Sequence, residues 1–178
     1  MGGLFRNRLN FFLFCVALWD IMSYNVRKWF KARKADKVFL GEFQHTMDSK
    51  GRVVIPSKFR DELQQGCVVT KGQDNCLQIL TKKNWNIEAE RMASLPSTDK
   101  TSRQLRRALF SGAIDVKIDT AGRVQIPENL RIYSGLEIND EVTVTGSGPV
   151  VEVWSTRNWK KIQTEADQAF ANINEVKG

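Results

Sequence analysis

Histidine is nearly absent from this sequence, and its scarcity narrows the chemistry available to the chain. The 178 residues include one histidine, His45, which lies in a segment of alternating apolar and polar residues and is expected to pack on a strand or at its rim. A Ser/His/Asp triad needs a histidine with an acidic partner, and no such partner is evident. The patterns G-x-x-x-x-G-K-[ST] and G-x-G-x-x-G are missing. We therefore predict that the protein is not an enzyme and takes no small-molecule substrate.

Cysteine is also scarce, and its spacing argues against the common metal sites. The three cysteines, Cys15, Cys67 and Cys76, form no C-x-x-C pair. Cys67 and Cys76 fall on predicted strands, so we expect small buried side chains in a reducing compartment and not zinc ligands or extracellular disulfides. The two D-x-x-G segments described below lack the alternating oxygen ligands of a calcium loop. The sequence therefore predicts neither a cofactor nor a metal ion.

The apolar segment near the N-terminus is too short to span a bilayer. Leu9–Trp19 resembles the apolar region of a signal peptide, but no A-x-A-like cleavage site follows it. Residues 1–37 carry eight basic and two acidic residues. We favour the interpretation that they are translated upstream sequence, with the native start at Val38, since valine can be the reading of a GTG start codon. The alternative is an interfacial anchor with the basic stretch Arg27–Lys37 at the membrane surface.

One nine-residue pattern occurs twice in the chain. DSKGRVVIP at 48–56 recurs as DTAGRVQIP at 119–127, at a constant offset of 71 residues. Further matches lie downstream of each copy: Phe59-Arg60 with Leu130-Arg131, and Thr81–Trp85 with Ser155–Trp159 after a three-residue insertion. Self-similarity of this kind indicates a structural repeat of roughly 45 residues.

The repeated pattern predicts a tight turn between two strands. Apolar and polar residues alternate on both sides of each D-x-x-G-R segment. An Asp that opens a turn can accept hydrogen bonds from backbone N–H groups two or three residues on, and the following Gly supplies a positive φ. We therefore expect Asp48 and Asp119 to fix their turns. Each turn would then aim its arginine, Arg52 or Arg123, either outward or back onto the Asp.

The rest of the chain sorts into two repeats, a helical insert and a terminal helix. The expected boundaries are 1–37 for the N-terminal extension, 42–84 for the first repeat, 85–112 for the insert, 113–156 for the second repeat and 157–178 for the C-terminal helix and tail. In the insert, Asn84 is expected to cap one helix and a second helix is expected at about Thr98–Ser111. Each repeat is too small to bury its apolar face alone, so we expect the two to share a core and the chains to associate.

Charge is distributed unevenly between the repeats. The segment Glu42–Asn84 has seven basic and five acidic residues, whereas Ala113–Thr156 has three basic and seven acidic ones. The second helix of the insert adds Lys100 and three arginines against the single acid Asp99. If the protein binds an anion, the first repeat and the insert are therefore the expected places.

Taken together, these motifs resemble the MraZ family of bacterial transcriptional regulators, which belongs to the AbrB-like (SpoVT-AbrB) superfamily. The residues that carry the resemblance are the two D-x-x-x-R segments, the opening FLGEF at 39–43, the Lys58–Arg60 helix and the arginine-rich insert at 105–107. The resemblance covers Val38 to about Phe170. It implies a mainly β fold with α, built as a tandem swapped-hairpin β-barrel with peripheral helices. It also implies a cytoplasmic, nucleoid-associated homo-oligomeric ring that binds direct repeats in the promoter of the division and cell-wall gene cluster.

Carried over by position, the resemblance makes Asp48 and Arg52 the DNA-contacting turn and Asp119 and Arg123 its second copy. A β-hairpin can enter the major groove, where Arg52 could donate two hydrogen bonds to guanine. Lys50, Lys58 and Arg60 are available for phosphates. The alternative is that each arginine only pairs with its own Asp and holds the turn; we favour DNA contact for Arg52 and leave both roles open for Arg123.

Three other questions stay open at the level of sequence. Arg103, Arg106 and Arg107 fit a solvated face, a phosphate contact or a subunit interface equally well. An AbrB-type interaction module is a rival function, although such modules usually carry one motif and this chain carries two. A membrane-surface protein anchored by Leu9–Lys37 is the other rival, whereas the family resemblance predicts no membrane partner.

Overall fold

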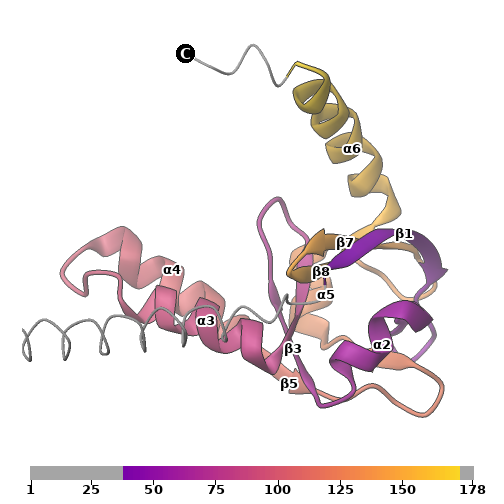
Figure 1. Cartoon of the computed structure of the whole chain (residues 1–178), viewed down its shortest axis with the longest axis horizontal. Coiled ribbons are helices and arrows are strands. Elements are labelled where there is room, and N and C mark those ends of the chain that lie inside the picture. The colour runs from indigo at the N-terminus through magenta and orange to yellow at the C-terminus, as the bar shows by residue number, and fades with distance from the viewer. Residues whose placement is uncertain (1–37, 173–178) are drawn as a thin grey trace, which may run out of the picture. The chain divides into compact units, whose positions relative to one another are not determined.

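The computed structural model describes residues 38–172 (Figure 1). The first repeat contributes β1 (Phe39–Thr46), β2 (Arg52–Val54), α2 (Ser57–Leu63), β3 (Cys67–Lys71) and β4 (Leu77–Thr81). Two helices follow, α3 (Lys82–Ala93) and α4 (Lys100–Gly112). The second repeat contributes β5 (Ile114–Val116), β6 (Arg123–Gln125), α5 (Glu128–Ser134), β7 (Glu141–Gly148) and β8 (Val150–Ser155), and α6 (Thr156–Ala171) comes last. The chain is mainly β with α, which confirms the predicted fold class.

Each repeat completes the sheet of the other. Six strands form one antiparallel sheet in the order β1-β7-β8-β4-β3-β5. The first strand of each repeat, β1 or β5, pairs with the third strand of the other, β7 or β3. The fourth strands, β4 and β8, pair with each other at the centre. The sheet therefore has an internal two-fold pseudosymmetry, and its hairpins are intertwined as the family resemblance implied.

The expected closed barrel does not form. The edge strands of the six-stranded sheet are β1 and β5, and no ladder joins them among residues 38–172. The turn strands β2 and β6 pair only with each other, as a separate two-stranded sheet of three residues per strand. Pro56 and Pro127 follow these strands closely, and proline has no N–H with which to extend a ladder. The body is therefore an open sheet joined to a short two-stranded ribbon.

The two repeats share one hydrophobic core, as the sequence predicted. Val53 in β2 and Val124 in β6 are fully buried, as are Ile55 and Ile126 directly after these strands. All four belong to the same cluster as the inner face of the large sheet. Phe59 of α2 is 1% exposed, a degree of burial that stabilises the fold by roughly 2 to 3 kcal/mol. Neither repeat has a separate core, so each repeat depends on the other for its stability.

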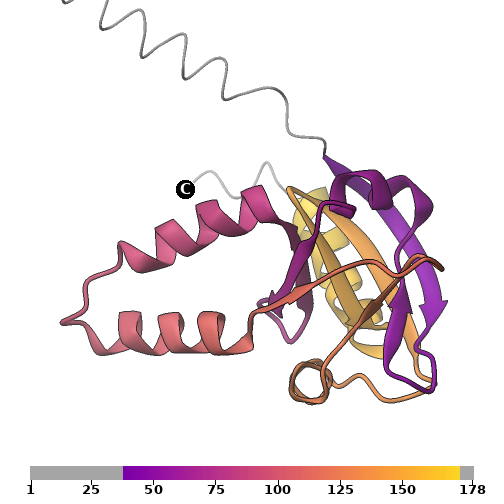
Figure 2. The ribbon, with the colours of Figure 1, turned by 90° about the horizontal axis from the view of Figure 1, so that it is seen from below.

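The insert helices begin at residues other than those predicted. Thr81, and not Asn84, caps α3, because the Thr81 hydroxyl accepts a hydrogen bond from the Asn84 backbone N–H at 3.2 Å. Asp99 caps α4 in the same way through the Ser102 N–H. Figure 2 shows α3 and α4 as an antiparallel pair extending to one side of the sheet.

The predicted extension at 1–37 and Cys15 lie outside the described residues. Among those described, none of the helices combines the length and the apolar character needed to cross a membrane.

Candidate nucleic-acid interface

The first D-x-x-G-R turn has the geometry that its sequence predicts. Oδ1 of Asp48 accepts hydrogen bonds from the backbone N–H groups of Lys50 and Arg52, both at 2.9 Å. The turn closes where the Gly51 N–H donates to the Asp48 carbonyl at 2.9 Å. Gly51 has a φ of 72°, in the left-handed region that glycine adopts without steric cost. The Asp and the Gly together therefore fix the direction of the arginine that follows.

The second turn repeats this arrangement almost atom for atom. Oδ1 of Asp119 accepts from the N–H groups of Ala121 and Arg123, again at 2.9 Å. Gly122 has a φ of 77°, and its N–H donates to the Asp119 carbonyl at 2.9 Å. The similarity of the two sequences therefore extends to the hydrogen bonds that hold the turns.

Both arginines turn back onto their own aspartates, and the two pairs form one network. Nε and Nη2 of Arg52 each lie 2.7 Å from Oδ2 of Asp48, and the same atoms of Arg123 each lie 2.9 Å from Oδ2 of Asp119. Across the repeats, Nη1 of Arg52 is 3.5 Å from Asp119, and Nη1 of Arg123 is 3.6 Å from Asp48. Two acids and two bases therefore meet at the pseudosymmetry axis.

The network keeps both carboxylates ionised. The hydrogen bond from the Arg52 side chain is the main cause that holds the pKa of Asp48 at about 2, with its backbone hydrogen bonds adding to the effect. The pKa of Asp119 is also lowered, chiefly by the backbone N–H of Arg123. Side-chain exposure of 24% for Arg52 and 30% for Arg123 leaves both guanidinium groups accessible to solvent.

A guanidinium held in this way can still bind a second acceptor. Its side-on edge, Nε and Nη2, faces the aspartate of its own turn. Its end-on edge, Nη1 and Nη2, carries further N–H donors in a fixed plane, and there Nη1 lies only at the longer distance of 3.5 or 3.6 Å from the aspartate of the other repeat. Such a fork matches a phosphate or the O6 and N7 atoms of guanine. The aspartate then acts as an orienting group that reduces the rotamer freedom of the arginine.

Arg60 lies over the turn of the opposite repeat. Its Nε donates to the Ile55 carbonyl at 2.8 Å. A Cβ placed on Gly122 would lie 2.2 Å from Cζ of Arg60, so the glycine leaves room for the guanidinium. Arg131 takes the equivalent position near Gly51, where the corresponding distance to its Nε is 3.1 Å. Each turn is thus covered by an arginine from the other repeat.

The two lysines assigned to phosphates are both exposed but differ in their surroundings. Lys50 lies within the first turn, and its carbonyl accepts a hydrogen bond from the Gln125 side chain at 2.6 Å. Lys58 lies on α2, with Nζ 4.5 Å from the centre of the Phe43 ring. Sequence reasoning assigned no role to Gln125 or to Arg131. The match of Arg131 with Arg60 at the repeat offset was the signal that could have identified it.

The histidine and the two buried cysteines show no feature of a catalytic group. His45 is partly buried, and burial followed by the charge of Arg60 lowers its pKa. Burial raises the pKa of Cys67 to about 11 and that of Cys76 to about 12, so both thiols stay protonated at neutral pH and are poor nucleophiles. Within 38–172, no cluster of three or more His, Cys, Asp or Glu side chains is placed to hold a metal ion.

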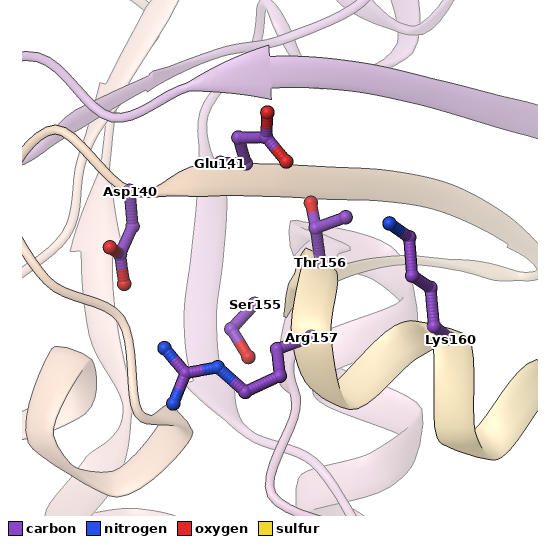
Figure 3. A pocket seen from close by; sticks show the side chains of 6 residues that line it. All are labelled: Asp140, Glu141, Ser155, Thr156, Arg157 and Lys160. Atoms are coloured by element: carbon purple, nitrogen blue, oxygen red, sulfur yellow. The ribbon is translucent and has the colours of Figure 1, made fainter.

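A shallow pocket of about 360 Å³ lies at the start of α6 (Figure 3). Its lining combines two acids, two hydroxyl side chains and two bases: Asp140, Glu141, Ser155, Thr156, Arg157 and Lys160. The acids come from the start of β7 and the residue before it, and the bases from the first turns of α6. Because the two acids and the two bases balance, the pocket has no net charge with which to attract a polyanion.

Comparison with protein families gives a match that spans both repeats. The family model described as "MraZ protein, putative antitoxin-like" matches residues 38–108 and again residues 109–176. The two matched segments cover most of the 178 residues and contain one D-x-x-x-R turn each.

Proposed function

The chain belongs to the MraZ family, and we propose that it is a sequence-specific DNA-binding transcriptional regulator and not an enzyme. Its targets would be short direct repeats in the promoter of the division and cell-wall gene cluster. The protein would bind them as a homo-oligomeric ring in the cytoplasm, associated with the nucleoid. No cofactor or small-molecule substrate enters this proposal.

The observation that carries the proposal is the paired D-x-x-G-R turn on a two-stranded ribbon. The strands β2 and β6 pair over three residues each, and both turns present an arginine oriented by an aspartate. A two-stranded β-ribbon fits the major groove of B-DNA, and arginine bonded to guanine O6 and N7 is the commonest specific contact there. The geometry therefore supports reading of guanine by the end-on edge of the Arg52 guanidinium.

Charge assigns the two repeats different parts in this proposal. Lys50 and Lys58 are exposed in the first repeat and would neutralise phosphates, joined by Arg60 once DNA approaches. The second repeat has seven acidic and three basic residues. Its net negative charge repels a phosphate backbone. We infer that Asp48 and Arg52 read DNA, whereas Asp119 and Arg123 chiefly complete the network and support assembly.

Footprinting and gel-shift titration of the full chain would test this function. The probe would be the promoter region upstream of the protein's own operon, with a scrambled sequence of equal length as the control, each at two salt concentrations. We expect protected short direct repeats, tighter binding to the promoter than to scrambled DNA, and affinity that falls with salt as counterions are released. Equal affinity for both probes would contradict a sequence-specific regulator.

The family description also mentions antitoxins, which supports an AbrB-type interaction module as a second candidate. In that case a protein partner would compete for the same surfaces. The other rival function, that of a membrane-surface protein, depends on residues 1–37, which lie outside the described part of the chain. Fractionation of cells that produce the tagged full chain separates these cases, because recovery wholly in the soluble fraction would remove the membrane reading.

A further inference from the structure

The last helix, α6, occupies the same place in its repeat as α3 does in the first. Each follows the fourth strand, and each is capped by a hydroxyl: Thr81 accepts from the Asn84 N–H at 3.2 Å, and Ser155 accepts from the Asn158 N–H at 3.3 Å. After the first repeat, α4 packs against α3, with the Trp85 and Phe110 rings in edge contact at 5.8 Å. The described chain provides no corresponding partner helix for α6.

The second half of α6 projects away from the sheet (Figure 1). The first half rests on β7 and β8, and Ile162 there is partly buried. Every residue from Thr164 to Ala171 is exposed, and Phe170 is 77% exposed. At 100° per residue, Ala166, Ala169 and Phe170 continue the stripe that starts at Ile162. Two solvent-surrounded turns of this kind gain little stability on their own.

Acidic residues flank this stripe on both sides. Glu165 and Asp167 precede and follow Ala166, so they lie at opposite margins of the apolar face. The segment from Thr164 to Ala171 contains no basic residue. We call the face formed by Ile162, Glu165, Ala166, Asp167, Ala169 and Phe170 the α6 stripe.

A complementary stripe runs along α4. Lys100, Arg103, Arg107 and Phe110 recur at helical spacing on one side, and α4 contains no acidic residue. Phe110 is 43% exposed although it contacts Trp85. Nη1 of Arg103 donates to the carbonyls of Ser97 and Thr98 at 2.8 and 2.7 Å, which leaves Lys100 and Arg107 as the exposed charges. We call these four residues the α4 stripe.

We propose that the α6 stripe of one copy packs against the α4 stripe of a second copy. An acid-flanked apolar face then meets a basic face that ends at the half-exposed ring of Phe110, so the two faces are complementary in charge and can also form an apolar contact. The two stripes are different surfaces of one chain, so each copy can offer its α6 stripe to one neighbour and its α4 stripe to another. In the proposed ring the contact is of this heterologous kind, with a rotation between copies that closes. The inference rests on the proposed homo-oligomer and names the surfaces that join its subunits.

Two other occupants of these surfaces are less well supported. An α6-to-α6 contact between two copies would bring Glu165 and Asp167 of both together, and like charges in contact are unfavourable. DNA would fit the basic α4 stripe, but it would leave the apolar face of α6 uncovered. A copy of the same chain accounts for both stripes at once.

Charge exchange between the stripes tests the inference on the full chain. The variant E165K/D167K alters the α6 stripe, K100E/R107E alters the α4 stripe, and a third variant combines all four changes. Light scattering without DNA would measure the mass of each, with circular dichroism to show that the helices are retained. The control is E128K/E137K, which removes two exposed acids outside both stripes.

We expect the wild type and the control to be multimers, each two-residue variant to lose the multimer, and the four-residue variant to regain it. F170S should raise the protein concentration needed for assembly by roughly tenfold or more, since it removes the largest exposed apolar group of the α6 stripe.

A wild-type monomer would refute the ring itself. A wild-type multimer whose mass none of the stripe variants changes would refute only this interface. Loss of DNA affinity in K100E/R107E at unchanged mass would show that the α4 stripe binds DNA instead.

Discussion

Nη1 of Arg52 lies 3.5 Å from Oδ2 of Asp119, although the two residues belong to different repeats. The reciprocal pair, Arg123 and Asp48, is 3.6 Å apart. The two D-x-x-G-R turns therefore form a single unit, and a change in one alters the electrostatic surroundings of the other.

Substitutions of Asp48 separate its role as a hydrogen-bond acceptor from its role as a charge. Asp48→Ala removes the acceptor for two backbone N–H groups, so we expect the melting temperature to fall by several degrees and DNA binding to weaken indirectly. Asp48→Asn keeps an oxygen in the same place and should retain much of both. Thermal melts and gel shifts measure the difference. Equal and complete loss in both variants would show that the charge is the essential feature.

Acid should remove the contribution of Asp48 at a predictable pH. The pKa of Asp48 is depressed from its ordinary value of 3.8 to about 2 in the folded state, so its ionised form stabilises the fold above pH 4. This contribution is lost as the pH falls from about 4 through 2. Urea unfolding of wild type and Asp48→Asn should show a stability difference at pH 6 that shrinks by pH 2.5. A difference independent of pH would contradict the ion pair.

Gly122 is expected to tolerate alanine poorly. Its φ of 77° disfavours a side chain, by roughly 1 to 2 kcal/mol, and the new Cβ would also meet the Arg60 guanidinium. Gly122→Ala should therefore lower the free energy of unfolding by more than Gly51→Ala, whose Cβ meets Arg131 less closely. In an Arg60→Ala background the excess should vanish. If the excess stayed the same, contact with Arg60 would not be its source.

Lys58→Ala tests the phosphate role of an exposed cation. Nζ of Lys58 lies over the Phe43 ring, 4.5 Å from its centre. We therefore expect the lysine to act on DNA only through its charge. We expect Lys58→Ala to weaken binding to promoter and scrambled DNA alike and to reduce the salt slope by about one unit. Gel-shift titrations at several salt concentrations would measure this. A change in discrimination between the probes would show that Lys58 contributes to sequence reading.

Local features of the fold could be predicted from sequence because they depend on short spacings. The acceptor role of Asp48, the positive φ of Gly51 and the burial of Cys67 and Cys76 all agree with expectation. The start of α3 was misplaced because Thr81 and Asn84 are both good capping residues, and only the end of β4 decides between them.

Features that depend on residues far apart in the chain could not be predicted from the sequence. The open sheet differs from the predicted barrel because closure depends on how far β2 and β6 extend, which no local pattern reports. The contact between Arg60 and Gly122 joins residues from different repeats, and only the pairing of β2 with β6 brings them together. The same pairing creates the network between the two turns, so sequence could name its four members but not their shared position.

The central claim is that the turn of the first repeat reads DNA, and the most direct measurement compares Arg52→Ala with Arg123→Ala. Both variants would be titrated by gel shift on promoter and scrambled DNA, with light scattering to confirm an intact oligomer. We expect Arg52→Ala to lose roughly 1 to 3 kcal/mol of promoter affinity and to discriminate less against sites with altered guanines. Arg123→Ala should keep promoter affinity and show its effect in stability or oligomer size. If Arg123→Ala abolished specific binding in an intact oligomer while Arg52→Ala did not, the claim would be wrong.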